Sequence, residues 1–153
     1  MKPILILCLF LSCIACGKLD SFEKNVAIPG HAWASDFIPE ISVEISDTAA
    51  VYDLFVVLRH TNAYRWNNLW INLYTQTPSD TARFNKQRFD IRLATDSKGW
   101  IGSGMDDIYE HRSLITTVRF PRPGTYTFRI EQLMREDPLE HILNAGIRIQ
   151  KVQ

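Results

Sequence analysis

Three carboxylates follow a pair of glycines in the middle of the chain, and together they could bind a metal ion. Asp106, Asp107 and Glu110 offer oxygen ligands of the kind that calcium prefers. Their spacing is not that of an EF-hand loop, and adjacent aspartates in an extended segment point to opposite sides. A tight loop, in which glycine supplies a positive φ and aspartate bonds the nearby backbone, explains the same residues. We therefore predict a loop without a metal, with a calcium site as the alternative.

The remaining reactive side chains form no pattern typical of catalysis. The four histidines are His31, His60, His111 and His141. They are scattered singly, so a zinc site would have to be assembled across strands. The chain has no Gly-x-Ser-x-Gly motif, and its cysteines all lie within the first sixteen residues. We predict that the protein is not an enzyme and that it holds no cofactor and no metal.

Aromatic and amide side chains gather in residues 64–70, where they could bind a partner. Tyr64, Trp66 and Trp70 lie there beside two asparagines. Aromatic faces next to amides suit sugar rings as well as proteins. Trp66 is the first candidate for a partner contact, followed by Tyr64 and, from another segment, Trp100. We expect Trp70 in the core, since tryptophan is highly buried on average.

Arg135 and Asp137 form a further candidate pair near the C-terminus. Because Asp-Pro dipeptides start turns, Arg135 could fix the turn at Asp137 and Pro138. A contact with a partner is the alternative role of the pair. Arginines also lie near acids in the sequence, which predicts ion pairs on an outer face that contribute about 0 to 1 kcal/mol each. These residues are Arg129, Arg135 and Arg148, with Glu131, Asp137 and Glu140.

The N-terminal segment has the pattern of a bacterial signal sequence. Lys2 supplies a positive charge, residues 4–11 are apolar, and small residues follow. The apolar run is shorter than the roughly 20 residues that span a bilayer. A small residue precedes Cys16, and this junction resembles the lipobox of bacterial lipoproteins. We predict lipidation of Cys16, with Cys13 as the alternative site.

Cleavage before Cys16 divides the chain into three parts. We expect a signal peptide at 1–15, a lipidated N-terminus and tether at 16–25, and a single domain at 26–153. The one remaining thiol then carries lipid, so the domain must be stabilised by packing without a disulfide. Acyl chains bind a membrane with about 0.8 kcal/mol per buried methylene. An uncleaved N-terminus that packs as a first strand or helix is the alternative.

Composition limits the partners. The chain of 153 residues is long enough for one ordinary domain, and its 46% hydrophobic and 22% charged residues are typical of soluble proteins. The 17 basic residues equal the 17 acidic ones, so no electrostatic footprint for DNA or RNA is present. We predict no binding of nucleic acid.

Some segments alternate apolar and polar residues with period two and others, such as 51–59, are runs of β-branched and aromatic residues; both patterns predict strands. These segments are 41–45, 51–59, 69–74, 87–93, 114–120, 126–131 and 146–152. Short strands with polar, Pro- or Gly-containing connections predict an all-β fold, an antiparallel β-sandwich with the jelly roll as one arrangement. One helical turn is expected at 137–143, with Asp137 as its cap and Pro138 in its first position.

Several short motifs run in order from the middle to the end of the chain. They are LRH (58–60), Tyr64, NLW (68–70), GWIGSG (99–104), DIYEH (107–111), QLMREDPL (132–139) and GIRI (146–149). Their order and spacing resemble the gliding motility lipoprotein family GldH of the Bacteroidetes, over nearly the whole mature chain. At Glu140 and His141 the chain departs from the family pattern, where a smaller residue such as glycine is expected.

The resemblance implies a lipid-anchored protein of the cell envelope that gliding requires, in machinery coupled to type IX protein secretion. It implies a membrane contact through the lipid, and partners among the envelope proteins of that apparatus, rather than a reaction. The alternative, supported by the aromatic residues, is a lipoprotein that binds carbohydrate, with a glycan as its ligand.

The residues around the anchor predict the location. Gly17 follows Cys16 where aspartate would retain a lipoprotein in the inner membrane, which favours the outer membrane. Residues 18–21 lack the acidic run of lipoproteins exported to the surface in that phylum. We therefore expect a domain that faces the periplasm.

Overall fold

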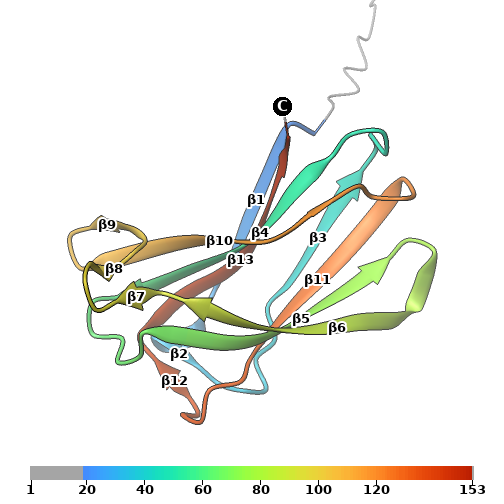
Figure 1. The fold of residues 1–153 in the computed structure, drawn as a ribbon. Coiled ribbons are helices and arrows are strands. Elements are labelled where there is room, and N and C mark those ends of the chain that lie inside the picture. The colour runs from blue at the N-terminus through green and yellow to red at the C-terminus, as the bar shows by residue number, and fades with distance from the viewer. Residues whose placement is uncertain (1–18, 153) are drawn as a thin grey trace, which may run out of the picture.

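The structure is a computed structural model, and it describes residues 19–152 (Figure 1). Strands make up most of this part of the chain. A single turn of 3-10 helix, η1 (Pro29–His31), is the one helical element among the described residues.

Two antiparallel sheets pack face to face and enclose the core (Figure 1). The first sheet contains, in spatial order, β1 (Ser21–Ala27), β13 (Ile142–Lys151), β4 (Tyr52–Thr61), β10 (Ile108–Val118) and β9 (Ser103–Met105). The second contains β3 (Glu40–Ile45), β11 (Gly124–Gln132), β5 (Asn68–Thr77) and β6 (Asp80–Arg92). Two small ribbons pair β2 (Ala32–Trp33) with β12 (Leu139–Glu140), and β7 (Ala94–Thr95) with β8 (Gly99–Trp100).

The order of the long strands is that of a jelly roll. Strands from the first half of the chain pair with strands from the second half in reverse order: β1 with β13, β3 with β11, β4 with β10, and β5 with β6. Successive pairs alternate between the two sheets. The chain is therefore a long antiparallel ribbon rolled into a sandwich, and the prediction of an all-β sandwich is confirmed.

Period-two alternation produces the core. In β3 the side chains of Ile41, Val43 and Ile45 are buried while the residues between them are exposed. The opposing sheet contributes a second buried row. That row consists of Tyr52, Leu54, Val56 and Leu58 on β4, with Ala145, Ile147 and Ile149 on β13. At about 25 cal/mol per Å² of apolar area removed from water, this burial is the main stabilising term in the described domain.

The expected tether is shorter than predicted. Residues 21–25 lie in β1, which pairs with β13 from Ser21 opposite Gln150 to Ala27 opposite Asn144. A Cβ atom on Gly146 would lie 2.0 Å from the Oδ1 atom of Asn25, so glycine is required for β1 to approach this closely. Phe22 and Val26 pack against the core, and this burial makes β1 part of the domain.

The predicted helical turn at 137–143 is wrong. Leu139 and Glu140 form β12 and pair with Trp33 and Ala32, and β13 begins at Ile142. The carboxylate of Asp137 accepts hydrogen bonds from Ser35 instead of capping a helix. Leu139 and Ile142 are both fully buried, so tertiary packing overrides the helix signals of the local sequence.

Besides β13, which begins at Ile142 instead of 146, two strands begin well before the predicted segments. β6 begins at Asp80 instead of 87, and β10 at Ile108 instead of 114. In both extensions most side chains lie near or on the surface, so the hydrophobic pattern that marks a strand is weak there.

His141 connects β12 to β13 with a left-handed backbone, at φ +71°. This conformation favours glycine, which explains why a smaller residue is expected at this point. The carbonyl oxygen of His141 accepts a hydrogen bond from the backbone N–H of Thr61 (3.1 Å), which fixes the turn against β4.

We expect His141→Gly to leave the free energy of unfolding unchanged or to raise it by up to about 1 kcal/mol, since glycine relieves the left-handed strain. His141→Val should lower it by about 1 to 3 kcal/mol, because a β-branched residue tolerates this backbone poorly. Urea unfolding followed by tryptophan fluorescence measures both. Equal effects of the two substitutions would show that the backbone conformation at 141 does not matter.

Candidate functional site

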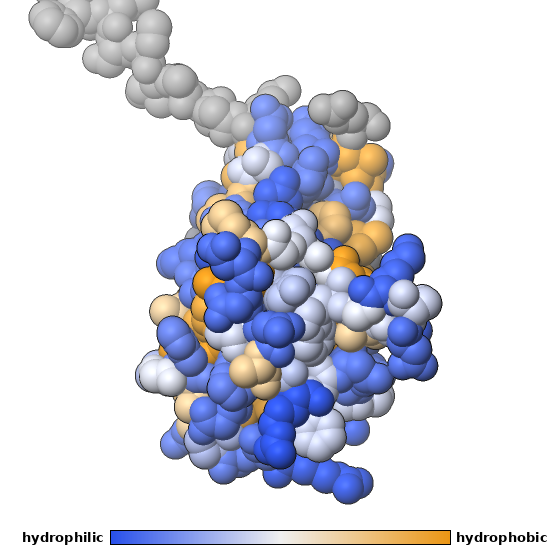
Figure 2. Space-filling view, turned by 90° about the vertical axis from the view of Figure 1, so that its left-hand side faces the viewer, coloured by the Kyte–Doolittle hydropathy of each residue, from blue (hydrophilic) through white to orange (hydrophobic). Residues whose placement is uncertain are grey.

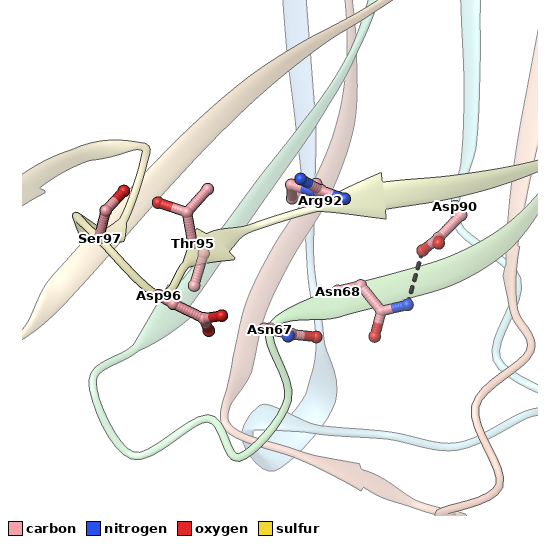
Figure 3. Close-up of a pocket in the computed structure, with 8 residues that line it drawn as sticks. Asn67, Asn68, Asp90, Arg92, Thr95, Asp96 and Ser97 are labelled. Carbon is pink, nitrogen blue, oxygen red and sulfur yellow. Dashed lines mark hydrogen bonds between the residues drawn. The ribbon is translucent and has the colours of Figure 1, made fainter.

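A polar pocket opens where β5, β6 and β7 meet, with a volume of about 420 Å³ (Figure 3). Its lining residues are Asn67, Asn68, Asp90, Arg92, Ala94, Thr95, Asp96 and Ser97. Thr95, Asp96 and Ser97 lie at one end of the pocket, and Asn68 and Asp90 lie at the other (Figure 3). Asn68 Nδ2 donates a hydrogen bond of 2.7 Å to Asp90 Oδ1. The pocket therefore presents amide, carboxylate, hydroxyl and guanidinium groups together.

An aromatic cleft of about 310 Å³ adjoins the polar pocket and shares Asn68 with it. The cleft is lined by Trp66, Asn68, Trp70, Leu133, Met134 and Arg135. A third hollow, also of about 310 Å³, is lined by Arg88 and by Trp70 and Leu133, which it shares with the cleft. Because neighbouring hollows share residues, the three form one feature, which we call the tryptophan groove.

The alternation of β5 places Trp70 in this groove. Leu69 and Ile71 are fully buried on the inner face, so Trp70 points outward and is 40% exposed. Its cross-strand neighbour on β6 is Asp90, a polar residue on the outer face. The prediction that Trp70 lies in the core is wrong, although the buried row of Leu69, Ile71 and Leu73 indicated the correct face.

Trp66 lies on the surface, as expected for the first candidate residue. It is 44% exposed, and its indole N–H donates to Glu136 Oε2 at 3.1 Å. This bond fixes the ring at one wall of the cleft. Trp66 and Trp70 are thus brought together, a pairing that the spacing of residues 64–70 did not specify.

The buried amide of Gln132 holds the other wall. Gln132 is 3% exposed, and its Nε2 group donates to the carbonyl oxygens of Trp33 (3.3 Å) and Glu136 (3.4 Å). Its Oε1 atom accepts the backbone N–H of Met134 at 2.8 Å. The residues that follow β11 are therefore fixed, and sequence analysis missed Gln132 because a lone glutamine carries no motif.

Backbone bonds attach this segment directly to β5. The N–H of Leu133 donates to the carbonyl oxygen of Trp70 at 2.8 Å, and the N–H of Trp70 donates to the sulfur of Met134 at 3.4 Å. The floor and the far wall of the cleft are thereby part of one rigid unit.

Tyr64 is buried and Trp100 is half-buried, and neither lines the groove. Tyr64 is 4% exposed, burial raises the pKa of its hydroxyl group, and that hydroxyl donates to the carbonyl oxygen of Asn68 at 2.9 Å. The indole N–H of Trp100 donates to Asn62 Oδ1 at 2.8 Å. Both rings pack against His60, so they support the loop that carries the pocket asparagines.

Two histidines meet in the interior, across β4 and β10. The Nε2 atoms of His60 and His111 lie 2.9 Å apart, the rings are stacked at 14°, and both residues are at most 3% exposed. Sequence analysis treated the histidines as single residues. The pairing follows from the register of the two strands, in which Tyr109 lies opposite His60 and His111 opposite Leu58.

The contacts of this pair require a neutral His60 ring. His60 Nδ1 lies 2.7 Å from the carbonyl oxygen of Thr61, which can only accept, so Nδ1 carries the hydrogen and Nε2 is free to accept from His111. Burial lowers the pKa of His60, and burial with the neighbouring His60 lowers the pKa of His111 to about 4. The pair is uncharged at neutral pH.

Arg135 and Asp137 are separated. Arg135 lines the aromatic cleft, whereas the carboxylate of Asp137 accepts hydrogen bonds from the hydroxyl (2.6 Å) and the backbone N–H (2.8 Å) of Ser35. These bonds, the hydroxyl's first, hold the pKa of Asp137 below its ordinary value. No ion pair joins Arg135 to Asp137 within residues 19–152, so Arg135 does not fix the Asp-Pro turn.

The predicted charge pairs between sequence neighbours are also wrong. Arg129 pairs with Glu40 on β3, and Arg148 pairs with Glu23 on β1 at 3.0 Å. Glu131 instead accepts hydrogen bonds from Asn72 and Tyr74 at 2.7 Å each. Residues two apart in a strand share a face but lie about 6.6 Å apart, whereas residues directly opposite on paired strands lie about 4.5 to 5.5 Å apart.

The carboxylate segment around 106 is a turn between β9 and β10. Glu110 pairs with Arg59 and, at 2.7 Å, with Arg112, so its oxygens are already engaged. The loop interpretation expected a glycine to supply the positive φ, but Asp106 adopts it, at φ +55°, and Gly102 and Gly104 do not. In the described residues, no cluster of three or more histidine, cysteine or acidic side chains is placed to hold a metal.

The histidine pair predicts a loss of stability in acid. An unfolded histidine binds a proton near pH 6.5, while folded His111 binds one only near pH 4, so the unfolded state takes up more protons between these values. The free energy of unfolding should therefore fall as pH drops below about 6.5, by up to about 1.4 kcal/mol per pH unit for one histidine.

Urea unfolding between pH 7.5 and pH 5 measures this slope. Carboxyl groups, whose unperturbed pKa is about 4, contribute little to the slope in that pH range. His111→Gln keeps an N–H donor toward His60 and should flatten the slope. His31→Gln, at an exposed histidine, should retain it. An unchanged slope in His111→Gln would contradict the assignment.

Cys16, Cys13, the signal peptide and the start of the tether lie outside the described residues. Residues 19–152 contain no helix with the length and apolar character that a membrane crossing needs.

Comparison with known proteins identifies the family. The family described as GldH lipoprotein matches residues 20–149. A gliding motility lipoprotein GldH homolog from Christiangramia forsetii is 29% identical over 90% of this chain and 87% of its own. The gliding motility lipoprotein GldH of Flavobacterium johnsoniae is 30% identical over 90% of this chain and 88% of its own.

A solved structure of infectious bursal disease virus, Gx strain, covers 87% of this chain and 32% of its own at 11% identity, with a TM-score of 0.30, which is too low to support an argument. The sequence matches cover almost all of the described jelly roll and extend over both walls of the tryptophan groove. The chain therefore belongs to the GldH family of gliding motility lipoproteins.

Proposed function

We propose that this gliding motility lipoprotein is a non-enzymatic component of a gliding apparatus coupled to type IX secretion, and that it acts through protein contacts. Its lipid, on Cys16, holds it at the outer membrane with the domain facing the periplasm. The family name supports a lipid-anchored envelope protein of gliding motility. The identity of Gly17 and the absence of an acidic run at 18–21 support the membrane and the face.

The groups with shifted pKa values support a structural rather than catalytic role. His60 and His111 contact each other beneath aromatic rings, and Glu23 forms ion pairs with Arg112 and Arg148. Ion pairs and interior packing account for these shifts. A domain built in this way holds a surface in place for a partner.

The exposed side chain of Met105 is the observation that carries the proposal of a protein contact. Met105 is 76% exposed, more than any other large hydrophobic residue described, and it ends the edge strand β9. Ile101, nearby in the chain, is 47% exposed. Methionine adapts its shape to a partner, and it is enriched in interfaces.

The surface around Met105 has a hollow and only scattered hydrophobic residues, which suits a contact made through a few side chains (Figure 2). A hollow of about 280 Å³ lies beside Met105, lined also by Gly104, Ile108 and Arg59 among others. Figure 2 looks onto the side of the molecule where β7, β8 and β9 lie, and hydrophobic residues form separate spots there among hydrophilic ones. A few buried anchors often supply most of the binding energy of an interface.

We expect Met105→Glu to abolish colony spreading and to reduce secretion of type IX cargo in a gliding bacterium that carries this chain as its sole copy. A charge at a buried contact costs several kcal/mol when it is left unpaired. Val152→Glu places the same charge at another exposed apolar residue, 43% exposed, and should leave both readouts unchanged. Immunoblots of the membrane fraction confirm equal amounts of protein.

The outcomes separate the parts of this proposal. Normal spreading with Met105→Glu would overturn the contact at β9. Lost spreading with normal secretion would overturn the coupling to type IX secretion.

Cys16→Ala tests the anchor. The variant should leave the membrane fraction, because the acyl chains supply most of the affinity for the bilayer. Spreading should fail with it. Separation of inner and outer membranes on a density gradient places the unmodified protein, and recovery with the inner membrane would overturn the proposed location.

A further inference from the structure

Each hollow of the tryptophan groove contains an arginine. Arg92 lines the polar pocket, Arg135 lines the aromatic cleft, and Arg88 lines the third hollow. None of the three forms an ion pair within residues 19–152, whereas seven other basic-acidic pairs do form there. The groove therefore carries a row of guanidinium groups without carboxylate partners.

Two aspartates, Asp90 and Asp96, also line the groove, so its arginines outnumber its acids by one. Asp90 accepts a hydrogen bond from Asn68, and Glu136 accepts one from Trp66. The carboxylate of Asp96 lies at the far end of the polar pocket from Asp90 (Figure 3). A guanidinium group binds a carboxylate through two parallel hydrogen bonds, so this row suits a ligand that carries several carboxylates.

Two flat indole rings lie along the same path. Trp66 is 44% exposed and Trp70 is 40% exposed, and both line the aromatic cleft. An exposed indole offers a broad apolar face, on which the C–H face of a sugar ring packs as other apolar groups do. The cleft, of about 310 Å³, can receive a ring between them.

The polar pocket supplies groups that match sugar hydroxyls. The side chains of Asn67, Asp96 and Ser97 line it, and none of them makes a hydrogen bond to another residue in the range 19–152. Amide, carboxylate and hydroxyl groups together provide both donors and acceptors, as the hydroxyls of a sugar require.

We propose that the tryptophan groove binds an acidic saccharide, a chain of sugar rings that carry carboxylates. Trp66 and Trp70 hold one ring, Arg88, Arg92 and Arg135 receive carboxylates along the chain, and the polar pocket receives hydroxyls. This activity goes beyond the protein contact proposed at β9, which lies on different residues.

An acidic peptide fits the groove less well. Its backbone would need to pair with the N–H and C=O groups of a strand edge. The groove instead presents side chains, from the outer faces of β5 and of the edge strand β6 and from the segment after β11. The polar pocket also has no apolar recess for an anchoring side chain, since Ala94 is the one apolar residue in its lining.

The groove is formed before any ligand arrives. Gln132 fixes the segment that carries Met134 and Arg135, and the bond to Glu136 fixes Trp66. Side chains that are already ordered lose little entropy on binding, which favours affinity.

The test measures binding of short oligomers of galacturonic acid and of mannuronic acid to the full-length lipidated protein in nanodiscs, by calorimetry. At least one acidic oligomer should bind at concentrations up to about 1 mM. The methyl ester of the same oligomer lacks the charges and should bind at least about tenfold more weakly. Added salt should weaken the binding of the acid form.

Matched variants locate the site. Trp70→Ala should weaken binding at least about tenfold, as removal of a central aromatic anchor does. Arg92→Gln should weaken it by about threefold to tenfold and reduce its salt dependence. Arg83→Gln, on β6 but outside the lining of the groove, should bind as the unmodified protein does.

Several results would overturn the proposal. Failure of both acidic oligomers to bind would do so, and so would equal binding of the methyl ester. Equal or stronger binding of a polyglutamate peptide that Trp70→Ala also weakens would assign the groove to an acidic protein segment. Urea unfolding of each variant shows whether a loss of binding reflects a loss of folding.

Discussion

The buried amide of Gln132 is the interaction on which the candidate site depends. Its side chain donates hydrogen bonds to Trp33 and Glu136 and accepts one from Met134. Together these three bonds define the course of the chain between β11 and β12. Leaving such groups unpaired in the interior would cost about 1 to 3 kcal/mol each, so the segment has one stable path. That path places Glu136 where it can bind the indole of Trp66, and Leu133 where it bonds to the backbone of Trp70.

The jelly roll explains why such a segment can be held from several sides. Every long strand except β6 pairs with a partner far away in the chain, so many turns lie against elements from the opposite end of the sequence. Asp137 thus meets Ser35, and β12 pairs with β2. The same topology sets β1 beside β13, so the first described strand and the last lie together (Figure 1). No disulfide is needed where sheet pairing and burial close the ribbon in this way.

Sequence reasoning predicted what local periodicity determines and failed where distant contacts decide. The alternation of residues 41–45 predicted the bounds of β3 to within one residue, because one face of that strand is buried and the other is exposed. The segment at 137–143 has a cap, a proline and a downstream glycine, yet Leu139 pairs with Trp33 and becomes a strand. Gln132 and the meeting of His60 with His111 had no local signal, since only strand register and loop packing create them.

Tyr64 connects the interior to the groove, and it shows why some candidate residues support the groove while others line it. Its ring lies 5.2 Å from that of His60, centroid to centroid, and its hydroxyl donates to the carbonyl oxygen of Asn68, which the polar pocket and the cleft share. Tyr64 supports this surface from the interior, whereas Trp66 lies on it, so aromatic content alone cannot separate support from contact. Tyr64 and the half-buried Trp100 are support in this structure, Asp137 binds Ser35 from an exposed position, and Trp66 and Arg135 line the cleft itself.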